Sequence, residues 1–97
     1  MSYNLLISPI AKAEIIDSTK WYNKQKKGLG LEFISEIDKS LKIIKNKPTL
    51  FSKIYKEYRM VLTDTFPFEI FYSVESNNII IHHVFHASRN PEIWKSN

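Results

Sequence analysis

The clearest pattern in this chain is an alternation of apolar and polar residues between positions 66 and 74. Side chains on a β-strand point to opposite faces in turn, so a period of two is typical of a strand with one buried face. The buried face is predicted to carry Phe68, Ile70, Tyr72 and Val74. For Tyr72 we therefore expect a place in the core, with its hydroxyl hydrogen-bonded.

The next apolar run, residues 79–86, is predicted to be an interior strand because both of its faces are largely apolar. The period of two places on a common face Ile79, Ile81, His83 and Phe85. The opposite face then includes His82 and His86. Between the two runs, Asn77 and Asn78 suit the positive backbone angles of a tight hairpin turn.

Two helices are predicted upstream of these strands. The first starts at Ser8 and Pro9, which suit a helix cap and a first helical position, and it ends at Gly28. Its modestly apolar face contains Ala11, Ile15, Ser18 and Tyr22. The second helix begins around Gly30 and ends before Pro48. Its strong apolar stripe contains Phe33, Ile34, Ile37, Leu41 and Ile44.

The remaining segments complete a single α+β domain over residues 1–97. Residues 3–7 are predicted to form the first strand, and residues 49–56 a loop leading into a strand that pairs with residues 58–63. Residues 90–94 are predicted to form a last helical turn whose Trp94 closes the edge of the core. The expected fold is an N-terminal strand, an antiparallel two-helix hairpin, and a three- to four-strand antiparallel meander that covers the hairpin.

Composition narrows the class of protein. The 97 residues, 43% of them hydrophobic, suffice for one modest core. No apolar run approaches the roughly 20 residues of a membrane span, and the N-terminus lacks the features of a signal peptide. With no cysteine for disulfides or thiolate ligands, a cytoplasmic protein that does not interact with a membrane is expected.

Positive charge is concentrated in one segment. The whole chain carries a net charge of +4, yet residues 42–59 alone contain six basic residues and one acidic residue, a net +5. Such a local field favours an acidic partner, either a nucleic acid or an acidic protein. The alternative is a solvated lysine-rich surface without a partner.

The candidate chemistry lies in basic residues, and neither a metal nor a cofactor is expected. Although His82 and His86 share a predicted face, four residues of strand separate them by about 13 Å, too far for a common zinc ion. Arg59 and Arg89 are the two arginines among 14 basic residues, and a guanidinium offers planar, bidentate contacts to phosphate or carboxylate. The alternative is that each arginine binds a carboxylate of the fold, such as Glu69.

Three motifs in register resemble the RelE/ParE superfamily of bacterial type II toxins. They are WYNKQKKGLGLEF (residues 21–33), FPFEIFY (residues 66–72) and HASRNPEIW (residues 86–94), with Arg59 between the first two. Members of this superfamily are encoded beside an antitoxin and are often called plasmid stabilisation proteins. The resemblance covers nearly the whole chain, and it implies growth inhibition and a short, partly disordered antitoxin that lies across the toxin.

The resemblance leaves two mechanisms open. RelE-like members are ribosome-dependent ribonucleases that cut messenger RNA, and on that branch Arg59, His86 and Arg89 would be the catalytic candidates, through charge stabilisation and proton transfer. ParE-like members poison DNA gyrase without comparable nuclease chemistry. The three motifs look more like the ParE side, and no tyrosine follows Tyr72 to act as the C-terminal acid or base of the ribonucleases.

The sequence therefore predicts a ParE-like toxin that inhibits growth through DNA gyrase. The alternatives are a ribosome-dependent ribonuclease and a decayed toxin that only binds its antitoxin. The surface predicted to meet the partner contains Lys53, Lys56, Arg59 and Arg89.

Overall fold

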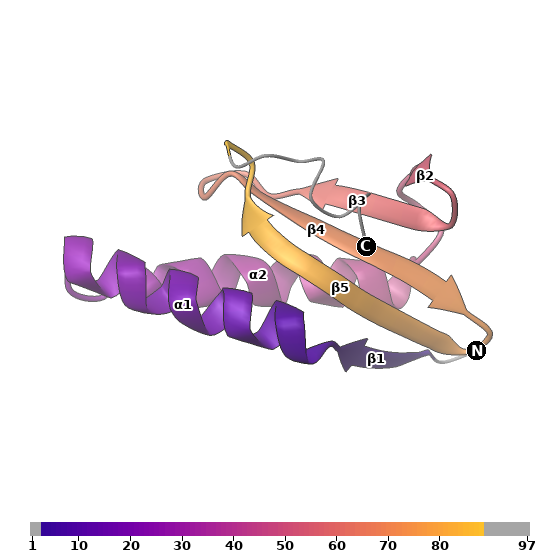
Figure 1. Ribbon diagram of the computed structural model, residues 1–97, viewed down its shortest axis with the longest axis horizontal. Helices are drawn as coiled ribbons and strands as arrows, with labels where there is room; N and C mark the ends of the chain where they lie inside the picture. The colour runs from indigo at the N-terminus through magenta and orange to yellow at the C-terminus, as the bar shows by residue number, and fades with distance from the viewer. Residues whose placement is uncertain (1–2, 89–97) are drawn as a thin grey trace.

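Two helices pack against one face of a five-stranded sheet in the computed structural model, which describes residues 3–88 (Figure 1). The elements in chain order are β1 (Asn4–Ile7), α1 (Pro9–Gln25), α2 (Leu29–Asn46), β2 (Lys53–Tyr55), β3 (Tyr58–Leu62), β4 (Phe68–Glu75) and β5 (Asn78–His86). The strands lie in the order β1-β5-β4-β3-β2, with β1 parallel to β5 and the other neighbours antiparallel. The predicted α+β fold is confirmed, with four strands in the antiparallel meander. The predicted helical turn and Trp94 lie outside the described residues.

The helical hairpin is set by its caps and by one glycine. Ser8 caps α1, because its Oγ accepts the backbone N–H of Ala11 at 3.0 Å, and Pro9 follows at the first helical position. Gly28, with a φ of 88°, stands between the helices in the left-handed region, which glycine adopts without a steric penalty. The sharp reversal at Gly28 lets both helices face the same side of the sheet.

The main core lies between the hairpin and the sheet. From α2 it contains Phe33, Ile37, Leu41 and Ile44, which are all buried as predicted. Ile34 was expected in the same stripe, and this prediction is wrong, because its side chain is 41% exposed. One position beyond Phe33 is about 100° around the helix, at 3.6 residues per turn, and that rotation turns Ile34 away from the sheet.

The predicted core face is confirmed for β4 and wrong for β5. The expectation of a single buried face is wrong for β4, because Phe71 and Ser73 on its other face are also buried, at 1% and 4% exposure. In β4, Phe68, Ile70 and Tyr72 are buried in the main core, and Val74 packs against it. In β5, the pairs Phe71–His83 and Tyr72–Ile81 leave His82 as an extra residue, a β-bulge. The bulge shifts the alternation by one position. Val84, rather than His83 or Phe85, therefore joins Ile79 and Ile81 in the main core.

The β4–β5 turn also differs from the prediction by one residue. The positive φ of 56° belongs to Ser76, whereas Asn78 already pairs with Glu75 and with Asn4. The predicted loop and short strand before β3 are confirmed, because β2 pairs antiparallel with β3.

Candidate functional site

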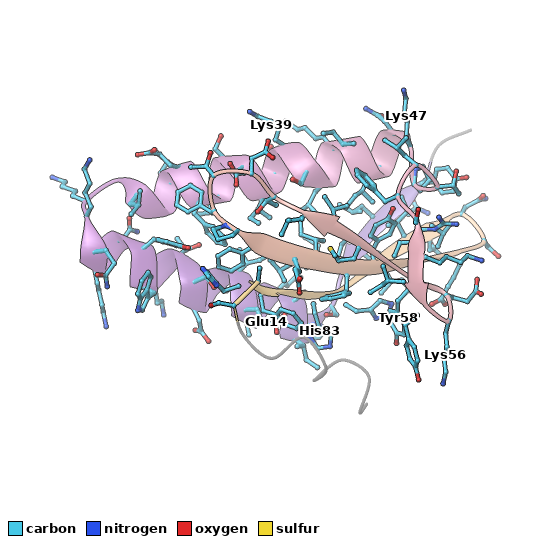
Figure 2. The ribbon with its side chains drawn as sticks, turned by 90° about the horizontal axis from the view of Figure 1, so that it is seen from above. Glu14, Lys39, Lys47, Lys56, Tyr58 and His83 are labelled. Atoms are coloured by element: carbon cyan, nitrogen blue, oxygen red, sulfur yellow. The ribbon has the colours of Figure 1, made fainter. Side chains whose placement is uncertain are left out.

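The predicted basic surface begins at the hairpin between β2 and β3. Lys56 lies in the turn, with a φ of 50°, and its Nζ is 5.2 Å from the centre of the Tyr55 ring (Figure 2). Lys53 forms an ion pair with Glu57, with 3.1 Å between Nζ and Oε1, and both side chains are about half exposed or more. Exposed ion pairs of this kind contribute little, so Lys53 can exchange Glu57 for another anion at small cost.

Arg59 has a different environment from these lysines. It is paired with Tyr72 across β3 and β4, so both side chains point to the helix side of the sheet. The Arg59 guanidinium donates a hydrogen bond to the carbonyl of Phe51 at 2.5 Å, and the Tyr72 hydroxyl donates one to the carbonyl of Pro48 at 2.7 Å. The two bonds tie the loop between α2 and β2 to the sheet. The alternative in which Arg59 binds Glu69 is wrong, because Glu69 lies on the opposite face of β4.

Tyr72 is the core tyrosine that the alternation predicted. Its side chain is fully buried and its hydroxyl is hydrogen-bonded. Burial raises the pKa of the Tyr72 hydroxyl above its ordinary value, although the nearby positive charge of Arg59 opposes the rise. Tyr72 therefore keeps its proton and serves as a hydrogen-bond donor within the fold.

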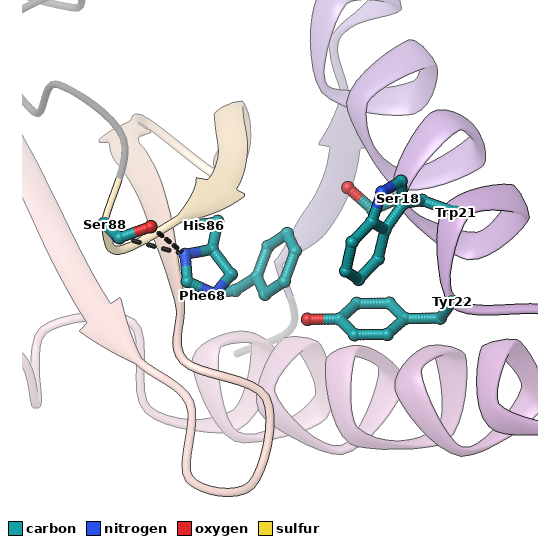
Figure 3. A pocket seen from close by; sticks show the side chains of 6 residues that line it. All are labelled: Ser18, Trp21, Tyr22, Phe68, His86 and Ser88. Carbon is teal, nitrogen blue, oxygen red and sulfur yellow. Dashed lines mark hydrogen bonds between the residues drawn. The ribbon is translucent and has the colours of Figure 1, made fainter. Parts of the chain in front are cut away.

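His86 lies at the other end of the sheet, beside a pocket of about 490 Å³ between α1 and the strands (Figure 3). The described lining is Ser18, Trp21, Tyr22, Phe68, His86 and Ser88. The backbone N–H of Ser88 donates to Nδ1 of His86 at 3.1 Å, and the Ser88 Oγ is 2.7 Å from the same nitrogen. Because a backbone N–H only donates, Nδ1 must accept, and the neutral ring carries its proton on Nε2. The ring also meets Phe68 edge to face, with 5.4 Å between centres.

The structure does not bring the two described ribonuclease candidates together. Phe68 pairs with His86 and Tyr72 pairs with Arg59, so four residues of β4 separate the two positions. At about 3.3 Å per residue this is about 13 Å along the strand, with β4 also lying between them. A group within hydrogen-bond reach of His86 is thus outside the reach of Arg59. The third candidate, Arg89, lies outside the described residues.

The bulge places His82 and His86 on opposite faces of the sheet, contrary to the predicted shared face. His82 is beside Ser73, with 2.8 Å between Nε2 and Oγ, and its ring meets Tyr58 edge to face at 5.0 Å. Ser73 in turn donates to Oε2 of Glu75 at 3.1 Å, so the serine proton is directed to the carboxylate and not to the histidine. Burial lowers the pKa of His82, with Glu75 opposing and His83 adding to the shift. The contacts among His82, Ser73 and Glu75 therefore give each polar group a hydrogen-bond partner, but they do not activate Ser73 as a nucleophile.

Sequence reasoning missed two glutamates that join the helices to the sheet. Glu14 of α1 accepts the backbone N–H of Val84 at 2.8 Å through Oε1, and its Oε2 is 3.4 Å from Nδ1 of His83. Glu36 of α2 accepts the backbone N–H groups of Thr65 and Phe66 at 3.1 and 2.8 Å. A single acid inside a helix carries no signal of such a role, because its partners are 29 to 70 residues away along the chain.

Among residues 3–88, no group of three or more His, Cys, Asp or Glu side chains could hold a metal ion. Neither α1 nor α2 is long and apolar enough to cross a membrane.

Comparison with known proteins gives a family and a similar structure. The family model described as the ParE toxin of the type II toxin–antitoxin system parDE matches residues 5–91. A search of curated proteins gave no match. Among solved structures, a chain of the chromosomal ParDE TA system from P. aeruginosa is similar, with a TM-score of 0.78 and 15% identity over 88% of this chain and 96% of that chain. At this level of identity the structural likeness concerns the fold alone.

Proposed function

This chain belongs to the ParE toxin family of type II toxin–antitoxin systems, and from that premise we propose that it inhibits growth by acting on DNA gyrase. The observation that carries the proposal is the family match over residues 5–91. As a toxin of this type, the chain has an antitoxin as its partner. We further propose that the antitoxin covers the working surface and blocks access to the target.

The geometry of the basic residues agrees with inhibition through binding. Cleavage of RNA needs a proton acceptor and charge-stabilising groups around one phosphate. Arg59 is instead hydrogen-bonded to the loop before β2. His86 lies two strands away, on β5, and their partners on the intervening β4, Tyr72 and Phe68, are four residues or about 13 Å apart. Lys56, in the turn of the β2–β3 hairpin, and Lys53, at the start of β2, are available to a protein partner.

The test is to express the chain alone and together with the antitoxin gene encoded beside it. Expression alone is expected to stop growth and to trap covalent gyrase–DNA breaks, and co-expression is expected to restore growth. In parallel, purified chain is expected to inhibit DNA supercoiling by purified gyrase, with gyrase alone as the control.

Two other outcomes would contradict the gyrase proposal. Messenger RNA cut inside translated codons, without gyrase–DNA breaks, would identify a ribosome-dependent ribonuclease. Undisturbed growth, with the antitoxin still bound, would identify a decayed toxin.

A further inference from the structure

The face of the sheet that points away from the helices carries a second buried cluster. Phe71 of β4 and Phe85 of β5 are 1% and 4% exposed, and their ring centres are 5.2 Å apart. Tyr55, Tyr58 and Met60 pack against them from β2 and β3. Every described hydrophobic residue of this cluster therefore belongs to a strand, whereas α1 and α2 lie on the opposite face (Figure 1).

Neighbours within a sheet do not bury a phenylalanine ring this far. Side chains stand roughly perpendicular to the sheet, so adjacent strands cover the sides of a ring and leave its outer end in water. A dry sheet face has a second layer of the protein packed on it. The exposures of Phe71 and Phe85 are those of one chain by itself, so this layer belongs to the same chain.

A carboxylate on the same face also needs a partner. Glu69 of β4 is paired with Phe85 of β5, so the two side chains point to the same side of the sheet. The Oε1 of Glu69 is buried, and within residues 3–88 it has no hydrogen-bond partner. Burial also raises the pKa of Glu69 above its ordinary value. Because an unpartnered buried oxygen is unfavourable, the covering layer is expected to bring a donor or a cation.

Two segments of the chain lie outside the described residues, and their lengths differ greatly. Residues 1–2 precede β1, whose pairing begins at Asn78, about 23 Å along β5 from Phe85. Residues 89–97 follow soon after the end of β5. Nine residues span about 30 Å when fully extended, whereas the three strand spacings from β5 to β2 amount to about 14 Å. The second segment is thus long enough to cross the whole cluster.

The composition of residues 89–97 suits this face. Ile93 and Trp94 are the large apolar side chains of the segment, and Arg89 is its cation nearest to β5. Glu69 is paired with the last but one residue of β5, so it lies where the segment begins. A return of the chain over this end of the sheet would bring a guanidinium to the carboxylate and an indole to the aromatic rings.

We propose that residues 89–97 cover the outer face of the sheet and complete a second core there. Trp94 packs on the two phenylalanine rings, and Arg89 supplies the missing cation for Glu69. Arg89 then acts within the fold and is not part of the surface that meets a partner. This inference goes beyond the proposed function and does not depend on gyrase as the target.

Tryptophan fluorescence tests the position of Trp94 in the intact chain. The chain has two tryptophans, so Trp21→Phe leaves Trp94 as the only one. Its emission is expected to be blue-shifted and resistant to acrylamide in buffer, and to become red-shifted and readily quenched in urea. Trp94→Phe is the matched control, because the remaining Trp21 is 57% exposed and should be quenched readily in the folded chain. Equal quenching of the two tryptophans in the folded variants would overturn the proposal.

A double-mutant cycle tests the pairing of Arg89 with Glu69. Arg89→Gln is expected to lower the urea midpoint of the wild type and to leave the midpoint of Glu69→Gln nearly unchanged, because the second background has already lost the pair. Lys95→Gln removes a cation from the same segment and is the control, which should shift both backgrounds equally. If Arg89→Gln also shifts both midpoints by the same amount, Arg89 is not the partner of Glu69.

Discussion

Glu36 shows how a single side chain can hold a turn in this protein. Its two carboxylate oxygens accept the backbone N–H groups of Thr65 and Phe66, at the turn between β3 and β4. Partial burial opposes ionisation, but the hydrogen bonds from Phe66 and Thr65 outweigh it and lower the pKa of Glu36 below its ordinary value. The charged form is therefore favoured in the folded state.

This shift predicts a pH dependence of stability. Because the folded pKa of Glu36 lies below the unfolded value of about 4.3, its contribution is complete above that pH and is lost as the pH falls through the folded pKa. Unfolding by urea should therefore show a steeper loss of free energy between about pH 5 and pH 3 in the wild type than in Glu36→Gln. Glu32→Gln, an exposed change on the same helix, is the control. Parallel curves for wild type and Glu36→Gln would show that the carboxylate has no such role.

At the scale of elements, the two helices contribute unequally to the core. Along α2 the buried positions follow three-and-four spacing, from Phe33 to Ile44, whereas the buried positions of α1 are Ala11 and Ser18. Small residues on α1 let that helix approach the sheet closely, and α2 supplies the volume. A small residue is also needed at Gly30, where the two helices meet, since a Cβ atom there would lie 2.7 Å from the side chain of Asn23.

The stripe on α2 predicts a contrast between two isoleucines three residues apart. Ile37 is 3% exposed and Ile34 is 41% exposed. Ile37→Ala should lower the free energy of unfolding by about 2–5 kcal/mol, because it leaves a cavity in the main core. Ile34→Ala should change it by less than about 1 kcal/mol, as at other surface positions. Urea denaturation of the two variants measures the contrast, and equal losses would contradict the assigned stripe.

At the scale of the whole molecule, one carboxylate replaces a missing strand. Strand β1 ends at Ile7, opposite Ile81, while β5 continues to His86. Beyond that point the chain has already turned into α1, and Glu14 returns from the helix to accept the N–H of Val84. This hydrogen bond joins α1 to β5 just beyond the point where the pairing of β1 with β5 ends, and it holds the helix against the sheet there.

Removing this contact should loosen the end of β5. Glu14→Ala leaves the Val84 N–H without its acceptor, at a cost of about 1–3 kcal/mol in the free energy of unfolding. Glu14→Gln keeps an acceptor oxygen and should lose less, which makes it the matched control. Hydrogen exchange at the Val84 amide should become faster in Glu14→Ala than in Glu14→Gln. Equal exchange in both variants would mean that the carboxylate does not support the strand.

Several features of the fold could be predicted because they depend on neighbours in the chain. The Ser8–Pro9 start of α1, the spacing of Phe33, Ile37 and Ile44, and the alternation in β4 all express a local period or cap. The resemblance to RelE/ParE toxins depended on three sequence motifs, residues 21–33, 66–72 and 86–94, and the family match over residues 5–91 confirms it.

The tertiary structure alone decided the bulge at His82, the partners of Glu14 and Glu36, and the distance between Arg59 and His86. A bulge cannot be recognised from the sequence, because no residue type marks the extra position. The alternation is therefore extended through the bulge, and every later residue of the strand is assigned to the wrong face. The position of Arg59 depends on register, and its partner Phe51 lies in a loop without periodicity. Helices and strands depend on the spacing of residues that are near in the sequence. A functional site depends on the distances between residues that are far apart in the sequence, and only tertiary packing determines these distances.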